Sequence, residues 1–78
     1  MAENRYLYMR TEEIGSAKTM RFDVVSRKSG GVLGQIKWFG LWRQYTFFPA
    51  SGTTYNHECL GYIQNFMLGL MEARRRKG

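Results

Sequence analysis

The sequence predicts an α+β fold in which a three- or four-stranded antiparallel meander is packed on one face by a single C-terminal helix. Two observations carry this prediction. Apolar residues alternate with polar ones along much of the first 48 residues, as in strands, and recur every three or four residues after residue 56, as in a helix. Short segments containing glycine separate the alternating runs, which favours hairpins. A chain of 78 residues has room for one domain, spanning 1–78.

The predicted strands lie at about 19–26, 32–39 and 43–48, with an N-terminal edge strand at 5–11 as the fourth. The Phe-Asp-Val-Val stretch suits the first of them, and the two glycines of RKSGG can adopt positive φ in the turn that follows. Gly34 indicates a bulge or a close backbone approach. Pro49 cannot donate to a ladder, so it ends the last strand.

A helix is predicted at about 56–75. Asn56 is a suitable N-cap, and Glu58 in the first turn suits the positive end of the helix dipole. An apolar stripe at helical spacing would cover one face of the sheet, and its members are Leu60, Ile63, Phe66, Met67, Leu70 and Met71. The other face of the sheet would be left to solvent or to a partner.

What the open face can bind depends on which aromatic rings of the segment KWFGLWRQYTFFP face the helix. Alternation in the last strand leaves two arrangements. In one, Tyr45 and Phe47 pack under the helix and the open face is ordinary and half-polar. In the other, both rings are on the open face together with Arg21, Lys37 and Arg43. That surface would be basic and aromatic, as in proteins that stack bases and steer phosphates.

The charge of the chain is concentrated at its C-terminal end. The net charge is +6, and four of the twelve basic residues form the run Arg74, Arg75, Arg76 and Lys77. The remaining chain carries eight basic and six acidic residues and is only mildly basic. Such a run attracts nucleic acid or acidic partners, or it serves as a solubilising helix end where the helix dipole favours cations.

We therefore expect a small non-enzymatic module that contacts DNA or RNA. Trp42, in a tight loop, would stack on bases while basic side chains neutralise phosphates. The full set of expected contacts is Arg21, Lys37, Trp42, Arg43, Tyr45, Arg74, Arg75 and Arg76. The alternative is a mobile-element protein that binds a host or phage protein through the same aromatic surface, for example as a defence inhibitor. A homodimer joined through the aromatic face is a third arrangement.

Catalytic, metal and cofactor chemistry have little support in the sequence. His57 and Cys59 at the predicted helix start point in different directions, so we expect no base–nucleophile pair and a Cys59 that packs as a small hydrophobic residue. One Cys and one His fall short of the four ligands of a structural zinc site. The single cysteine excludes an internal disulfide, and no apolar run approaches the roughly 20 residues that cross a bilayer. We expect no membrane contact and a cytoplasmic protein, in the host cell if a phage encodes it.

The stretch GQIKWFGLWRQYTFFP, followed by ECLGYIQNFM, resembles small uncharacterised proteins of bacteriophages and integrated mobile elements. The similarity runs from about Lys18 to Arg74, and its most specific element is Trp-Arg-Gln-Tyr-x-Phe-Phe-Pro at 42–49. The resemblance implies a phage context and no particular activity. Three strands followed by one helix is also similar to the arm-binding domains of phage-type integrases, which lay their sheet on DNA. That analogy concerns the fold alone, and the large catalytic domain of those enzymes is missing from this chain.

Overall fold

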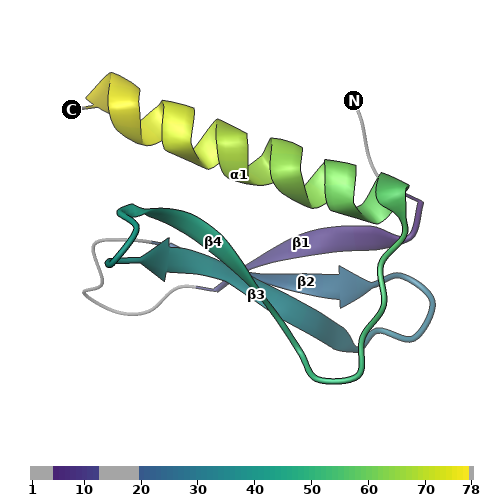
Figure 1. Cartoon of the computed structure of the whole chain (residues 1–78). Coiled ribbons are helices and arrows are strands. Elements are labelled where there is room, and N and C mark those ends of the chain that lie inside the picture. Colours follow the sequence, from purple (N-terminus) through teal and green to yellow (C-terminus); the bar gives the residue numbers. More distant parts are fainter. Residues whose placement is uncertain (1–4, 13–19, 78) are drawn as a thin grey trace.

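The computed structural model describes residues 5–12 and 20–77 and contains a four-stranded antiparallel sheet with one helix across it. In chain order the elements are β1 (Leu7–Glu12), β2 (Arg21–Ser26), β3 (Val32–Phe39), β4 (Gln44–Pro49) and α1 (His57–Lys77). Each strand pairs with the next, so β1 and β4 are the edges of a meander. Figure 1 shows α1 running along one face of this sheet. The predicted α+β class is confirmed, with four strands.

The predicted boundaries lie close to the observed ones. The segment 32–39 is β3, and the N-terminal edge strand expected at 5–11 is present as β1, paired with β2. The other strands and the helix begin and end within two residues of the expected positions. The first residue of the strand expected at 19–26 lies outside the described residues. In the described part of the chain, no helix is long and apolar enough to cross a membrane.

The hydrophobic core lies between α1 and one face of the sheet. Val24 and Ile36 are fully buried in the central strands, and Ile63 of the helix is buried above them. Phe22 and Phe66 meet edge to face with their ring centroids 4.9 Å apart, which joins β2 to the helix. As expected from alternation, the residues at 22, 24, 36 and 38 face the helix.

The helix begins where the sequence predicts, but its buried stripe is displaced by one residue at the start. The side chain of Asn56 accepts a hydrogen bond of 2.8 Å from the Cys59 N–H, so Asn56 is the N-cap. This arrangement turns Cys59 into the core, four residues before Ile63. Leu60, expected to lead the apolar stripe, is instead 51% exposed because it lies about 100° around the helix from Cys59.

The pairing of β2 with β3 contains a bulge next to Gly34. Val25 pairs with Val32 while Val24 pairs with Gly34, so β3 contains one extra residue at Leu33. The ring of Phe47 packs against the backbone of Gly34, where a methyl group would lie 2.7 Å from the Phe47 Cε1 atom. The close approach expected at Gly34 is confirmed, and it fixes Phe47 on the helix side.

The segment between β4 and α1 is anchored to the sheet. The Tyr55 hydroxyl donates a hydrogen bond of 2.7 Å to the carbonyl of Leu33, and the Tyr55 ring meets Phe47 edge to face at 5.3 Å. These contacts tie the segment before α1 to β3 and β4, and α1 itself contacts β4 near its C-terminal end, where Met71 Sδ accepts the Tyr45 N–H.

Candidate nucleic-acid interface

The face of the sheet that points away from α1 has a closed half and an accessible half. On β2, Asp23 and Val25 are buried although they face away from the core. On β3 and β4, the outward side chains are half-buried or exposed, and they are Gln35, Lys37, Phe39, Gln44, Thr46 and Phe48. A ligand on this face would therefore contact the β3–β4 half.

The closed half is organised around the carboxylate of Asp23. Arg10 Nη2 donates to Asp23 Oδ2 at 2.8 Å, and Gln35 Nε2 donates to Asp23 Oδ1 at 3.2 Å. The hydrogen bond from Arg10 is the main reason that the pKa of Asp23 lies below its usual value, and the charge of Arg21 acts in the same direction. Asp23 is thus held ionised by cations that lie beside it on this face.

The accessible half combines one cation with a row of rings. Lys37 Nζ lies 4.8 Å from the centroid of the Phe48 ring, a cation–π distance. Phe48 meets Phe39 at 5.9 Å, and Phe39 meets Trp42 at 4.9 Å, both edge to face. The row leads from the middle of the open face to the β3–β4 turn. Sequence reasoning missed Phe39 and Phe48 as members of this surface, although the alternation that places Lys37 outward also places Phe39 outward.

Both residues of the β3–β4 turn that were expected to contact a ligand are exposed to solvent. Trp42 is 63% exposed and Arg43 is also exposed. Arg43 has φ of 55°, in the left-handed region that residues with a side chain rarely adopt. Its N–H donates to the carbonyl of Phe39 at 2.9 Å, which closes the turn before β4 begins at Gln44.

Tyr45 is not on the open face, and its assignment as a sheet contact is corrected. Tyr45 is only 8% exposed, and its ring meets that of Trp38 at 5.5 Å on the helix side. Its N–H donates to Met71 Sδ at 3.4 Å, and its hydroxyl accepts from the N–H of Met20 at 3.4 Å. The reason is the turn: β4 starts at Gln44 facing outward, so alternation directs Tyr45 and Phe47 inward, where their apolar area is removed from water.

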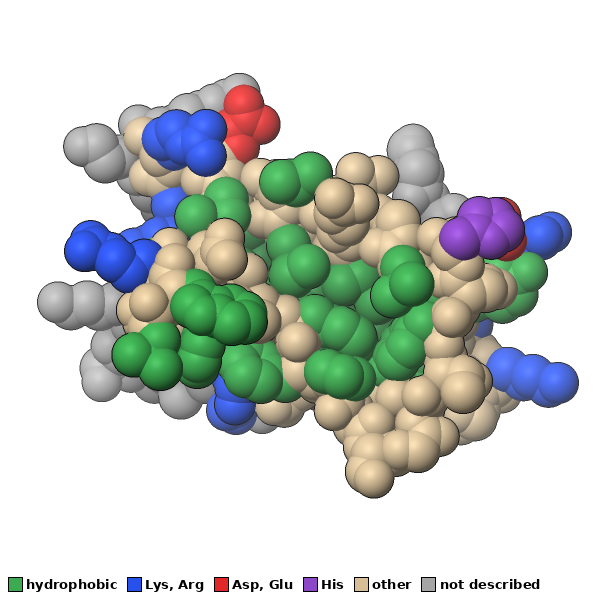
Figure 2. Space-filling model, in the orientation of Figure 1, with side chains coloured by type: hydrophobic (Ala, Val, Ile, Leu, Met, Phe, Trp, Pro, Cys, Tyr) green, Lys and Arg blue, Asp and Glu red, His purple; other side chains and the backbone are tan. Residues whose placement is uncertain are grey.

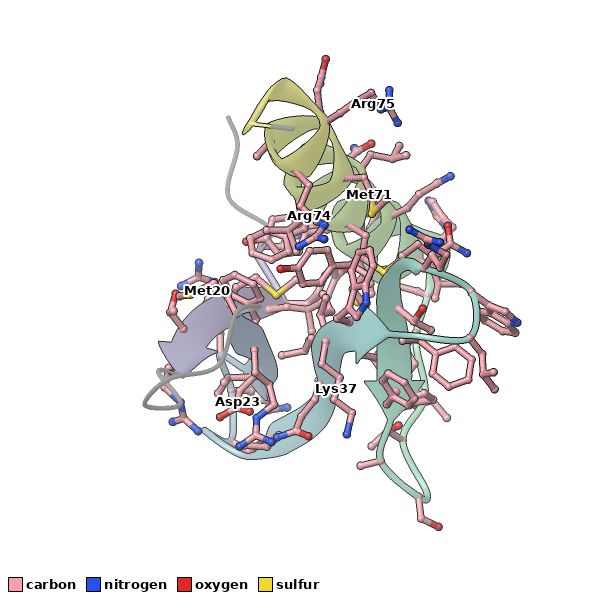
Figure 3. The ribbon with its side chains drawn as sticks, turned by 90° about the vertical axis from the view of Figure 1, so that its left-hand side faces the viewer. Met20, Asp23, Lys37, Met71, Arg74 and Arg75 are labelled. Atoms are coloured by element: carbon pink, nitrogen blue, oxygen red, sulfur yellow. The ribbon has the colours of Figure 1, made fainter. Side chains whose placement is uncertain are left out.

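The arginines at the end of α1 lie on the other side of the sheet from Lys37. Arg74 packs its guanidinium over the Trp38 ring, with Cζ 4.0 Å from the centroid, while Arg75 is exposed. Figure 3 looks at the molecule from this end and shows Arg74 between helix and sheet, Arg75 above, and Lys37 below the sheet. Arg76 belongs to α1, and its side chain lies outside the described part.

The remaining expected contacts gather at one end of the molecule. The β3–β4 turn and the C-terminal end of α1 lie at the same end in Figure 1. We call this surface the basic rim, and it consists of Arg21, Lys37, Trp42, Arg43, Arg74 and Arg75. Among the acidic side chains that the structure describes, Asp23 is bound by Arg10 and Glu58 pairs with Arg5 at 3.5 Å near the helix start. Glu72 is exposed on α1.

The groups considered for catalysis are placed apart from this rim, at the start of α1. Cys59 is 5% exposed and packs in the core, as expected, while His57 is exposed. Within residues 5–12 and 20–77, no three His, Cys, Asp or Glu side chains lie together in a way that could hold a metal ion.

Comparison with known proteins identifies a phage relative. The chain is 36% identical over 59 residues to an uncharacterized 9.3 kDa protein of Acholeplasma phage L2, and the match covers 76% of each chain. No protein-family model matches the sequence, and no solved structure matches it. The expected likeness to small phage proteins is confirmed at this level. The chain belongs to the same family as the 9.3 kDa protein of Acholeplasma phage L2.

Proposed function

We propose that this protein is a non-enzymatic module that binds nucleic acid through the basic rim. The observation that carries the proposal is that Trp42 and Arg43 are exposed in the β3–β4 turn, while Lys37 lies at the other end of the row of rings formed by Trp42, Phe39 and Phe48. Trp42 offers an exposed ring for stacking, and base–aromatic stacking is worth about 1–3 kcal/mol per base. The cations neutralise phosphates on either side of it.

The backbone at Arg43 gives this proposal independent support. A side chain in the left-handed region costs about 1–2 kcal/mol, and glycine would adopt that conformation freely. Strained positions of this kind cluster where a side chain has a task. We infer that the guanidinium of Arg43 contacts phosphate and that Arg43→Gly loses binding without loss of stability.

The path across the rim explains how cations on both sides of the sheet can act on one ligand. A strand of nucleic acid that crosses the turn would meet Lys37 on the open face and Arg75 at the end of α1. Arg74 is held over Trp38 and contributes mainly long-range attraction. We place this interaction in the host cytoplasm, and of the motif at 42–49 we assign Trp42 and Arg43 to the site. Both assignments belong to the proposal.

Binding is tested by fluorescence anisotropy with single-stranded DNA, single-stranded RNA and duplex DNA over a series of salt concentrations. Affinity should fall steeply with salt, and Lys37→Gln should reduce the slope of log K against log salt by about one. Lys28→Gln is the matched control, because it removes the same charge from the exposed β2–β3 turn. The proposal is wrong if no probe binds at low salt, or if both variants change the slope equally.

A second candidate function is binding of a host or phage protein, and the exposure of Leu41 favours it. Leu41 is 85% exposed beside Trp42, and an apolar side chain adds nothing to phosphate recognition. Exposed aromatic residues with arginine are typical of protein-binding hot spots. Leu41→Ser should then lower affinity for a partner captured from nuclease-treated lysate, with little dependence on salt. Under the nucleic-acid proposal the same variant leaves DNA and RNA binding unchanged.

A further inference from the structure

We propose that the groove between β4 and α1 binds an acidic, amphipathic segment of another protein, with a large apolar side chain of that segment in the groove and its carboxylates beside Arg43 and Arg75. The groove has a volume of about 240 Å³. Aromatic and apolar side chains form most of its lining, and they are Trp42, Tyr45, Phe47, Met67, Leu68 and Met71. Figure 2 shows hydrophobic side chains gathered on the face where α1 lies beside β4, with Lys and Arg side chains at the left-hand end of that face.

The size and the exposure of the groove suit a side chain of a protein partner. Pockets that bind small molecules measure about 300–1,000 Å³, so this groove is smaller than most of them. The groove is open to solvent, because Trp42 is 63% and Leu68 58% exposed. The lining also includes the polar side chains of Gln44, Thr46 and Gln64. Their amides and hydroxyl can form hydrogen bonds with a peptide backbone, whereas an acyl chain would leave them without partners.

The partner has to bind through its side chains, because the edge of β4 cannot accept another strand. Met71 Sδ already accepts the Tyr45 N–H at 3.4 Å on the outer side of β4. Pro49, at the end of the same strand, has no N–H to donate. Addition of a strand depends on main-chain hydrogen bonds along the whole edge. An apolar side chain that fills the groove is the remaining way to anchor a partner, and such anchors supply most of the affinity of protein interfaces.

Two cations at one end of the groove favour an acidic partner. In the chain, Arg43 lies between Trp42 and Gln44, which both line the groove. Arg75 lies one helical turn beyond Met71 on the same face of α1, since positions i and i+4 are neighbours on a helix. Both arginines are exposed, and the ion pairs found among the described residues involve neither of them. The β3–β4 turn and the C-terminal end of α1 lie at the same end in Figure 1, so one acidic segment can meet both.

The same features disfavour other occupants. In a two-fold contact a second copy presents the same patch, and no acidic side chain lines this groove to meet the arginines. Contacts to phosphate and sugar need polar donors, which the apolar side of the groove at Met67, Leu68 and Met71 does not supply. Glu72 is the acidic residue of α1 closest in sequence to Arg75, but it lies about 100° around the helix from Met71 and does not line the groove.

The inference rests on the second candidate function, binding of a host or phage protein, and it names the site and the chemistry of that partner. It is tested by selecting binders from a random library of short peptides displayed on phage, with the intact chain as the target. We expect the selected peptides to share acidic residues next to a large apolar side chain. A library that yields no binder, or only basic or uncharged ones, would overturn the proposal.

Matched variants then locate the selected peptide, whose affinity is measured by fluorescence anisotropy. Leu68→Ser should weaken binding at least about fivefold, as truncation of an important interface residue does. Leu60→Ser makes the same change on a similarly exposed part of α1 outside the groove and should leave the affinity unchanged. Arg75→Gln should weaken binding about two- to fivefold, the effect of losing an exposed ion pair. Lys28→Gln, which removes the same charge from the β2–β3 turn, should have no effect.

The variants also separate this inference from the functions on which it builds. A peptide weakened by Leu41→Ser but not by Leu68→Ser would keep protein binding at the β3–β4 turn and would overturn the groove as its site. Equal effects of Arg75→Gln and Lys28→Gln would overturn the assignment of an acidic partner. The titration contains no nucleic acid, so binding of DNA or RNA by the basic rim can fail or succeed independently.

Discussion

The close contact at Gly34 yields the sharpest stability prediction for this fold. A Cβ built on Gly34 would lie 2.7 Å from Phe47 Cε1, 2.9 Å from Phe47 Cζ and 2.8 Å from the carbonyl oxygen of Phe48. The first two atoms belong to a ring that is held by Tyr55, and the third belongs to the backbone of β4. Gly34→Ala therefore requires both the ring and the strand to move.

The expected magnitude follows from two opposing effects. Overpacking of a well-packed site costs about 1–3 kcal/mol. Replacing Gly by Ala also restricts the unfolded chain, which offsets about 0.4–1 kcal/mol of that cost. The net loss for Gly34→Ala should be about 1–2 kcal/mol. In a domain of this size each kcal/mol corresponds to about 4–8 °C in Tm.

Urea unfolding followed by tryptophan fluorescence measures this loss as a lower midpoint at an unchanged slope. Gly69→Ala is the matched control, because Gly69 lies in the middle of α1 and a Cβ there would meet nothing within 4 Å. That variant should gain up to about 1 kcal/mol from the higher helix propensity of Ala. A Gly34→Ala variant as stable as the parent would refute the packing of Phe47 on Gly34.

Three further changes test the contacts that hold the fold. Asn56→Ala should cost about 1 kcal/mol in urea unfolding by removing the N-cap bond to Cys59, while Asn56→Asp should retain most of it. The pKa of Asp23 is lowered in the folded state, so the ionised Asp23 side chain stabilises the fold at neutral pH. This stabilisation of the fold is lost as the pH falls below about 3.8. Asp23→Asn should therefore be less stable than the parent at pH 7, and an acid titration should show the difference shrinking. Arg74→Gln should cost about 0.5–1 kcal/mol in thermal unfolding through its lost contact with Trp38, and Arg75→Gln should cost less.

The order and type of the elements could be predicted because local chemistry determines them. Gly30, Pro49 and the N-cap Asn56 act within a few residues, and each has the expected role, whereas Gly31 does not adopt the positive φ expected of both glycines. Alternation alone also accounts for the inward positions of Phe22 and Ile36, since both lie in regular stretches of strand.

The face of the last strand could not be predicted, because it depends on the geometry of one turn. Both arrangements of Tyr45 satisfied the alternation, and only the four-residue turn closed at Arg43 decides between them. A left-handed arginine has no sequence signature. The same turn brought Phe48 to the open face. The sequence therefore predicted the cations of the site, but it placed the ring of Tyr45 on the open face, where the ring of Phe48 lies.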